Sequence, residues 1–432
     1  MATLNSFIPS MFVLALFILP FFPVKSLQAS ENFQFLSLGP RNLPSTLQQI
    51  KFKPNNPSKT KLMQTDKTLT LPVQSGKYFK TDKYIVTFGL GSPHQELSLA
   101  FNTVSNLIWA RCSPDIPAFR LDLYFNPTIS KTYYSYPCNS VVCTNFFPNS
   151  QNCNSNKTCI YSGKYDDHSV SDGIFSEDNL NMTGEPSNFI FLCVPYKPIF
   201  SGIPNFSGNA GLLGLGRGDL SLPGQIGVMY NNYFSYCLPS NSDSIGYLTF
   251  GKNNNNNNVI KFTTLFSSKD YPSFYFIRIV SISVGGRNLQ IDYKSRFFQN
   301  PGTVIDSGTL ITRLPVAAYA SMRDAFVQLM KDYPVAPAYG ILDTCYRNTT
   351  DKQIDMNNVP PVSFTFDGNV TIDFDASGIF YVVDSTLVCF AFANNTHDAP
   401  YLSVFGNAQQ KKMEVVYDVG NQKLGFRPNG CD

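Results

Sequence analysis

Residues 303–311 read TVIDSGTLI, a short polar turn between two apolar strands. Residues 98–109 read SLAFNTVSNLIW and repeat the same order of apolar run, turn and apolar run. The turn of the later stretch carries a carboxylate, Asp306, whereas the earlier turn carries an amide, Asn102. An amide cannot accept a proton from water at working pH. The first functional question is therefore whether chemistry that needs two carboxylates survives on one.

The duplication extends beyond these two turns. A GLLGLG segment at 211–216 follows the first turn, and an SVFGN segment at 403–407 follows the second at a similar spacing. Each segment pairs large apolar residues with a glycine. A repeat of this length predicts two related lobes that meet at a cleft, with one turn from each lobe at the interface.

Composition favours a secreted chain that is mostly β. The 432 residues suffice for two domains with real cores, and Phe and Tyr, which favour strands, number 37 and 23. An apolar run at Met11–Val24, followed by Ser26 and Ala29, is typical of a signal peptide, which we assign to 1–29. Because no other stretch is long and apolar enough to span a bilayer, we expect a soluble protein, extracellular or vacuolar through the secretory pathway.

The ten cysteines fit the same compartment, since an even number in a secreted chain suggests five disulfides. Metal binding is the weaker alternative, because the spacings match no standard zinc pattern and the chain has only three His. We therefore expect no metal and no cofactor.

Charge is distributed unevenly along the chain. Ten of the 33 basic residues but only three of the 30 acidic residues lie at or before Lys83. The basic segment 30–75 is either a solvated linker or a prosegment that docks on the acidic body. The body lacks a basic patch, so we expect no nucleic-acid partner.

Local patterns predict several elements. Strands are expected at 84–90 and 97–101, and a helix is expected to begin after Pro315, where apolar residues recur at helical spacing. The Cys-rich region 112–160 is expected to be irregular. The asparagine run 253–258 is expected to form an exposed loop.

Several motifs together resemble the pepsin-like aspartic proteases, and more closely the plant nepenthesin-like branch. The matching motifs are DSGT at 306–309, GLLGLGRGDLSL at 211–222, FSYCL at 234–238 and GNAQQ at 406–410. The resemblance implies a bilobal, mostly β fold with a long substrate cleft between an N-terminal lobe at 76–255 and a C-terminal lobe at 256–432. It also implies that 30–75 is a propeptide, and we expect a monomer.

Proteases of this family use two carboxylates that share one proton and hold a water between them. The resemblance assigns these positions to Asp306 and Asn102. Supporting residues lie in the two turns: Ser307, Gly308 and Thr309, and Thr103, Val104 and Ser105. General acid–base catalysis contributes ~10²–10⁴-fold, so loss of one carboxylate should be severe.

Two further departures from the family lie near this site. Val104 replaces a glycine and adds β-branched bulk beside the water position. Tyr165 stands at the expected flap tyrosine, but DDHS at 166–169 replaces the usual Gly-Asp-Gly-Ser. Tyr165 can also be read as a half-buried strand aromatic. His168 beside two acids suggests a metal site or triad, but a solvated loop is the better interpretation.

The family pattern implies the disulfides Cys345–Cys389 and Cys237–Cys431. Six sequons are possible glycosylation sites: Asn156, Asn181, Asn205, Asn348, Asn369 and Asn394.

Two functions remain open. The first is a secreted pseudo-protease that binds a peptide or protein through its cleft, as plant relatives with damaged dyads that inhibit cell-wall-degrading enzymes suggest; a secreted enzyme would then be a possible target. The second is a working aspartic endopeptidase active at acid pH. The clustered departures favour the first, so we expect peptidase activity to be absent or very weak, and a scaffold whose site has decayed is a blander third option.

Overall fold

The computed structural model describes residues 68–114, 123–146, 153–164, 170–181, 187–195, 209–252, 260–349, 352–395 and 402–431. Several predictions fall outside these residues: the signal peptide, most of the basic segment, the asparagine run, and the Tyr165 and His168 loop. No helix among the described residues has the length and apolar character needed to cross a membrane.

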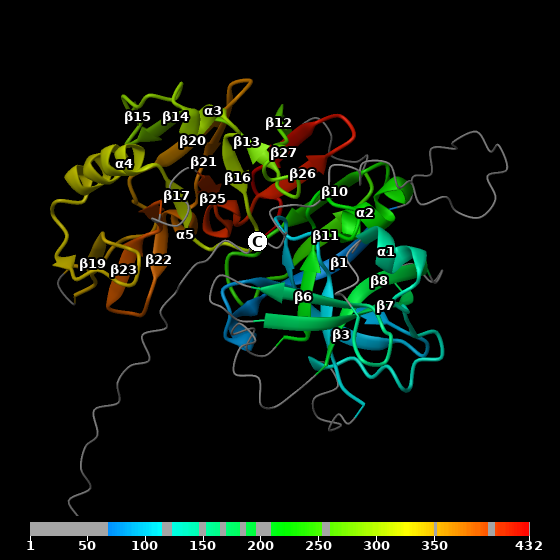
Figure 1. Ribbon diagram of the computed structural model, residues 1–432. Coiled ribbons are helices and arrows are strands. Elements are labelled where there is room, and N and C mark those ends of the chain that lie inside the picture. Colours follow the sequence, from blue (N-terminus) through cyan, green and yellow to red (C-terminus); the bar gives the residue numbers. More distant parts are fainter. Residues whose placement is uncertain are drawn as a thin grey trace, which may run out of the picture. The chain divides into compact units, whose positions relative to one another are not determined.

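The largest sheet has 14 strands in the order β12-β27-β26-β10-β11-β1-β2-β3-β9-β4-β8-β7-β5, with β6 beside β7 (Figure 1). Its strands are β1 Leu69–Ser75, β2 Tyr84–Leu90, β3 Gln95–Asn102, β4 Trp109–Cys112, β5 Tyr134–Ser135, β6 Ile160–Lys164, β7 Val170–Asn181, β8 Ser187–Pro195, β9 Gly211–Gly214, β10 Tyr233–Cys237, β11 Gly246–Phe250, β12 Lys261–Thr264, β26 Glu414–Asp418 and β27 Lys423–Arg427.

Three smaller sheets belong to the C-terminal half, with strand orders β13-β16-β25-β17-β24, β15-β14-β20-β21 and β18-β19-β23-β22. Their strands are β13 Phe276–Ile277, β14 Ile279–Val284, β15 Arg287–Asn288, β16 Thr303–Ile305, β17 Thr312–Leu314, β18 Val335–Ala336, β19 Cys345–Arg347, β20 Val362–Phe366, β21 Val370–Asp373, β22 Phe380–Val382, β23 Leu387–Phe390, β24 Phe392–Asn394 and β25 Ser403–Phe405.

Helices are few and short. The α-helices are α1 Val141–Phe146, α2 Leu222–Ile226, α3 Arg296–Gln299, α4 Val316–Leu329 and α5 Ala376–Ile379, and 3-10 turns lie at Gly76–Phe79, Gly227–Tyr230 and Asn407–Gln410. The longest, α4, confirms the helix predicted after Pro315. Its buried face carries Phe326, whose ring stacks on that of Phe390 at 4.2 Å between centroids.

The duplication seen in the sequence is confirmed by matching strand pairings. In the first copy β3 runs parallel to β9, which pairs antiparallel with β4, and β4 runs parallel to β8. In the second copy β16, β25, β17 and β24 repeat the same three relations. Asn102 is the last residue of β3, and Asp306 directly follows β16. Each polar turn is therefore fixed between buried strands by the same local topology.

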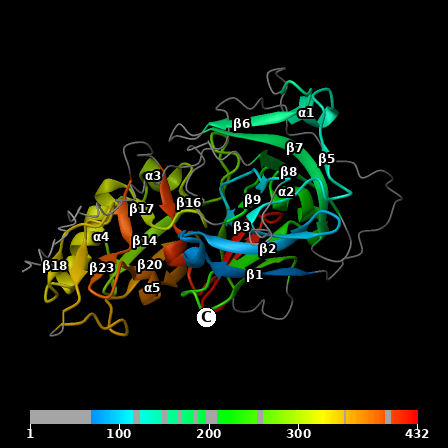
Figure 2. The same ribbon diagram turned by 90° about the horizontal axis from the view of Figure 1, so that it is seen from below.

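The N-terminal edge of the body differs from the linker expected there. Residues 69–75, part of the basic segment expected at 30–75, form β1, and this strand pairs with β11 along five residues and with β2 along three. Figure 2 shows β1 beside β2. Alternation explains the pairing, because Leu69, Leu71 and Val73 are buried while the residues between them are exposed.

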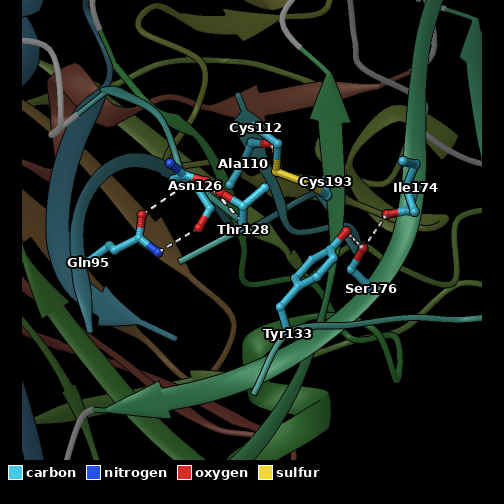
Figure 3. Close-up of a disulfide and its surroundings, with 9 residues drawn as sticks. All are labelled: Gln95, Ala110, Cys112, Asn126, Thr128, Tyr133, Ile174, Ser176 and Cys193. Carbon is cyan, nitrogen blue, oxygen red and sulfur yellow. Dashed lines mark hydrogen bonds between the residues drawn. A yellow bond between two sulfur atoms is a disulfide. The ribbon is translucent and has the colours of Figure 1, made fainter. Parts of the chain in front are cut away.

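The Cys-rich region is tied down by three disulfides, Cys112–Cys193, Cys138–Cys153 and Cys143–Cys159. Figure 3 shows the Cys112–Cys193 disulfide, which joins the last residue of β4 to the neighbouring strand β8. The same close-up shows the Gln95 side chain bonded twice to the backbone of Asn126, at 2.8 and 2.9 Å, which anchors the irregular segment after β4. The region is not wholly irregular, because α1 lies within it.

The other two disulfides are Cys237–Cys431 and Cys345–Cys389, the pairs that the resemblance implies. All ten cysteines are paired.

Candidate functional site

The Asn102 and Asp306 turns are interlocked by side chain–backbone hydrogen bonds. The Thr103 hydroxyl donates to the carbonyl of Ile305 at 3.1 Å and accepts from the amide of Ser307 at 3.0 Å. The Thr103 amide in turn donates to the Ser307 hydroxyl at 3.2 Å. Both hydroxyl residues are fully buried. These bonds bring together two turns that lie about 200 residues apart in the chain.

Asn102 and Asp306 hold equivalent positions in this pair of turns. The Val104 amide donates to Oδ1 of Asn102 at 2.8 Å, and the Gly308 amide donates to Oδ1 of Asp306 at 2.7 Å. Both side chains are 3% exposed. The amide at 102 therefore keeps the turn that an aspartate would form, because its carbonyl oxygen accepts the same backbone hydrogen bond.

The turns differ at the second polar atom of each side chain. Thr309 donates its hydroxyl hydrogen to Oδ2 of Asp306 at 2.5 Å. The corresponding hydroxyl, that of Ser105, instead donates to the carbonyl of Leu107 and accepts from its amide, both at 3.2 Å. The reason is chemical: an NH₂ group of Asn102 has no lone pair to receive the serine hydrogen. Ser105, a supporting residue by the resemblance, therefore bonds within its own loop.

The third residue of each turn has a different environment. A Cβ built on Gly308 would lie 2.4 Å from Nδ2 of Asn102, so any side chain at this position would displace that of Asn102. The equivalent residue of the first turn is Val104, which is buried and belongs to an apolar cluster. The cluster partners come from the C-terminal half: Phe274, Phe276, Val304 and Leu402. An apolar side chain of the first turn is thus buried among residues of the C-terminal half.

Asp306 is a buried carboxyl group surrounded by hydrogen-bond donors. Burial raises its pKa above the ordinary value, while the donors Thr309 and Gly308 and the positive charge of Lys83 oppose the rise. Burial lowers the pKa of Lys83 to about 8, and the negative charge of Asp306 acts in the opposite direction. Sequence reasoning gave Lys83 no role, because its position in the chain carries no catalytic motif.

Two side chains of the GNAQQ motif at 406–410 form hydrogen bonds with the backbone of the Asp306 turn. The side-chain amide of Asn407 donates to the backbone carbonyl of Ser307 at 3.0 Å and to that of Asp82 at 3.5 Å. The side-chain amide of Gln410 donates to the backbone carbonyls of Asp306 and Phe405 at 3.3 and 2.8 Å. The motif therefore belongs to the same site although it lies about 100 residues from the turn in the chain, because its side chains bond the backbone of the turn.

The remaining predicted residues are dispersed. Trp109 is 4% exposed and packs in a core cluster with Leu192 and Leu212. Asn156, Asn369 and Asn394 are exposed and Asn348 is half-buried, whereas Asn205 and the side chain of Asn181 lie outside the described residues. Within the described ranges no three His, Cys, Asp or Glu side chains are placed to hold a metal ion.

Comparison with known proteins follows the two halves of the chain. Residues 84–252 match the family described as xylanase inhibitor N-terminal, and residues 274–428 match xylanase inhibitor C-terminal. An aspartyl protease family protein of Arabidopsis thaliana is 40% identical over 370 residues, covering 84% of this chain and 76% of the relative. Aspartic proteinase nepenthesin-2 of Nepenthes gracilis is 32% identical over 378 residues, covering 86% of this chain and 82% of the relative.

Among solved structures, conglutin gamma, a basic 7S globulin from lupine seeds, superposes with a TM-score of 0.65 at 21% identity. The superposition covers 84% of this chain and 95% of the globulin, and it shows likeness of fold alone. With both halves matched and relatives at 40% identity, the chain belongs to the pepsin-like aspartic protease family, among the plant aspartyl proteases related to nepenthesin.

Proposed function

We propose that this protein is a secreted, non-proteolytic member of its family that binds a peptide or protein in the cleft expected of the fold. The observation that carries the proposal is the Val104–Asn102 hydrogen bond, which matches the Gly308–Asp306 bond. An amide thus stands at the place that the resemblance gives to the second carboxylate, in a turn that is otherwise intact.

The missing function is proton acceptance. A water held between two carboxylates loses a proton to the ionised member while the other supplies one to the substrate carbonyl. Asn102 can hydrogen-bond a water, but its amide neither accepts that proton nor shares one with Asp306. Val104 adds apolar bulk at the same turn. Asp306 therefore remains as one titratable group in a site whose chemistry uses two.

The ligand class follows from the fold, not from the turn. A pepsin-like fold suits an extended peptide, and the matched domain family is described by xylanase inhibitors. A secreted enzyme is therefore a reasonable target, as is a free peptide. We further propose the signal peptide at 1–29, a propeptide upstream of the body, lobes at 76–255 and 256–432, and a monomer. Tyr165 is proposed as a flap residue over the bound ligand.

A second candidate function, an endopeptidase working at acid pH, is favoured by one observation. Asp306 is buried, its pKa is raised, and its donors Gly308 and Thr309 are in place. Perturbed carboxyl groups of this kind concentrate at functional sites.

One experiment separates the two functions. The secreted form is purified, any propeptide is processed, and an unfolded protein substrate is incubated at acid pH beside an Asp306→Ala variant. Cleavage that disappears in the variant supports the endopeptidase. Absence of cleavage, with saturable binding of a peptide or of a plant cell-wall-degrading enzyme such as a xylanase, supports the binding protein.

A further inference from the structure

The turn between β20 and β21 ends with Asn369, the first residue of a sequon. Phe366 pairs with Val370, so the turn consists of residues 367–369. Gly368 and Asn369 both have positive φ, 79° and 60°. Asparagine adopts this left-handed backbone more readily than most residues that carry a side chain. The turn therefore holds Asn369 in a conformation that this residue tolerates.

The same turn is anchored to the body through its first residue, Asp367. The backbone amide of Asp367 donates to the carbonyl of Arg278 at 3.0 Å, and its backbone carbonyl accepts from the Thr263 hydroxyl at 2.8 Å. The next two residues, Gly368 and Asn369, are exposed. The turn is thus fixed at its base and presents Asn369 to solvent.

The sequon at Asn369 has both of its polar side chains at the surface. The Asn369 side chain makes no hydrogen bond to the residues that the structure describes. Thr371 is exposed, and its hydroxyl lies 2.9 Å from that of Thr365 on the neighbouring strand. Asn348, which also begins a sequon, is different: it is half-buried, and its side-chain oxygen and nitrogen bond backbone groups at 3.0 and 3.4 Å. A large group on the amide nitrogen therefore has room at Asn369.

Two strands at the edges of their sheets meet at this turn. β21 is the last strand of the sheet β15-β14-β20-β21, and β12 is the terminal strand of the largest sheet. Thr263 belongs to β12, so its hydrogen bond to Asp367 joins the two edges. In β21 the side chains alternate, with Val370 and Ile372 buried and the residues after each of them exposed. An edge strand of this kind offers unpaired backbone groups to a second chain unless something covers it.

We propose that Asn369 carries an N-linked glycan and that this glycan covers the edges of β21 and β12. The glycan comes from a lipid-linked diphosphate oligosaccharide. The Asn369 amide nitrogen bonds the anomeric carbon, the bond from that carbon to the diphosphate oxygen breaks, and the nitrogen loses one proton as the lipid diphosphate leaves. Because an attached glycan is bulky and hydrophilic, it keeps a second chain from pairing with either edge. The proposal rests on the secretion stated in the proposed function and on no property of the Asn102 and Asp306 turns.

Site occupancy is the first test. The full chain is expressed in eukaryotic cells, and the secreted protein is treated with a peptide N-glycosidase in ¹⁸O water, which converts each glycosylated asparagine into labelled aspartate. Mass spectrometry of the peptides should find the label at Asn369. A secreted protein without label at Asn369 would overturn this proposal alone. A chain that stays inside the cell and carries no label at any sequon would overturn the proposed secretion as well.

Two substitutions remove the glycan by different routes. Asn369→Gly keeps a residue that tolerates positive φ, and Thr371→Val keeps the asparagine but removes the hydroxyl that the sequon needs. Both variants should lose the label at this position, whereas Thr371→Ser should keep it. A label that persists in Thr371→Val would contradict N-linked attachment. Thermal unfolding identifies the folded variants, and two independent routes keep the test valid if one variant fails to fold.

Association between chains tests the role of the glycan. After storage at high concentration, size-exclusion chromatography should show that Asn369→Gly and Thr371→Val lose monomer to larger species. Thr371→Ser should match the parent. Asn156→Gln should also match it, because this variant alters an exposed sequon in the Cys-rich region and leaves both edges covered. Equal monomer content in all variants would show that the glycan does not protect these edges and would overturn its proposed role.

Discussion

Restoring the carboxylate at 102 should not by itself restore cleavage. We predict that Asn102→Asp yields little peptidase activity and that Val104→Gly is needed as well. The contact geometry gives the reason. A Cβ on Gly308 would lie 2.4 Å from the Asn102 amide, closer than real Cβ atoms approach. The matching position of the first turn carries a real side chain, Val104, which packs among Phe274, Phe276 and Val304. We therefore expect the first turn to leave less room for the water than a glycine turn would.

The magnitudes separate the variants clearly. A positioned general base contributes ~10²–10⁴-fold, which is about 3–5 kcal/mol of the activation barrier. Val104→Gly also loses a side chain that is 4% exposed among Phe274, Phe276 and Val304. That loss costs about 1.5–3 kcal/mol for burial and ~0.5–1 kcal/mol for glycine flexibility. The double variant should therefore gain at least ~10²-fold in rate over Asn102→Asp while unfolding at a lower temperature.

The assay measures initial cleavage of an unfolded protein at acid pH for the parent, both single variants and the double variant. Each is also tested with Asp306→Ala added, which should abolish any gain. Thermal unfolding of every variant, recorded at the assay pH, ensures that only folded protein is compared. Strong Asp306-dependent cleavage by Asn102→Asp alone would refute the reasoning, because it would show that Val104 leaves the water position open.

Three further predictions concern stability. Thr103→Val should lower the free energy of unfolding by about 2–4 kcal/mol, because the carbonyl of Ile305 and the amide of Ser307 lose their partner. Ser307→Ala removes only the acceptor of the Thr103 amide and should cost less. Urea unfolding measures both costs, and equal values would contradict the interlock of the two turns. The raised pKa of Asp306 gives the folded state stability that is full below the unfolded value near 3.8 and is lost as pH rises through the folded value. Asp306→Asn should therefore unfold at a higher temperature than the parent at pH 7 but not at pH 3, and calorimetry showing the same difference at both would exclude this linkage. Replacing Cys237 and Cys431 by serine should cost about 2–4 kcal/mol, because their bridge closes a long loop, and an unchanged melting temperature would argue against it.

The sequence predicts the parts of this structure that depend on local pattern. Three features can be predicted because each depends on residues that are neighbours in the chain. They are the apolar strands around Asp306, the helix after Pro315 and the duplicated order of motifs. The sequence predicts a linker where β1 forms, because the short apolar alternation of this strand adjoins a Lys- and Asn-rich stretch. The short helix α1 was missed because disulfides, and not helical periodicity, hold its surroundings.

The contacts that build the site could not be read in the same way. Thr103 and Ser307 meet across about 200 residues, and Asn407 reaches the Ser307 carbonyl from 100 residues away. Asn407 also bonds the carbonyl of Asp82, the residue before Lys83. A single sequence shows which side chains can make these bonds, but only the folded topology shows which of them meet.

The position of β1 bears on how the chain can be trimmed. Because this strand fills the gap between β11 and β2, a cut after Ser75 that released it would open a slot in the middle of the largest sheet. The facing backbone N–H and C=O groups of β11 and β2 would lose their hydrogen-bond partners, and unpaired strand edges promote association between chains. Maturation that ends upstream of Leu69 leaves the sheet whole, so the mature amino terminus would start before the ladder and not after it.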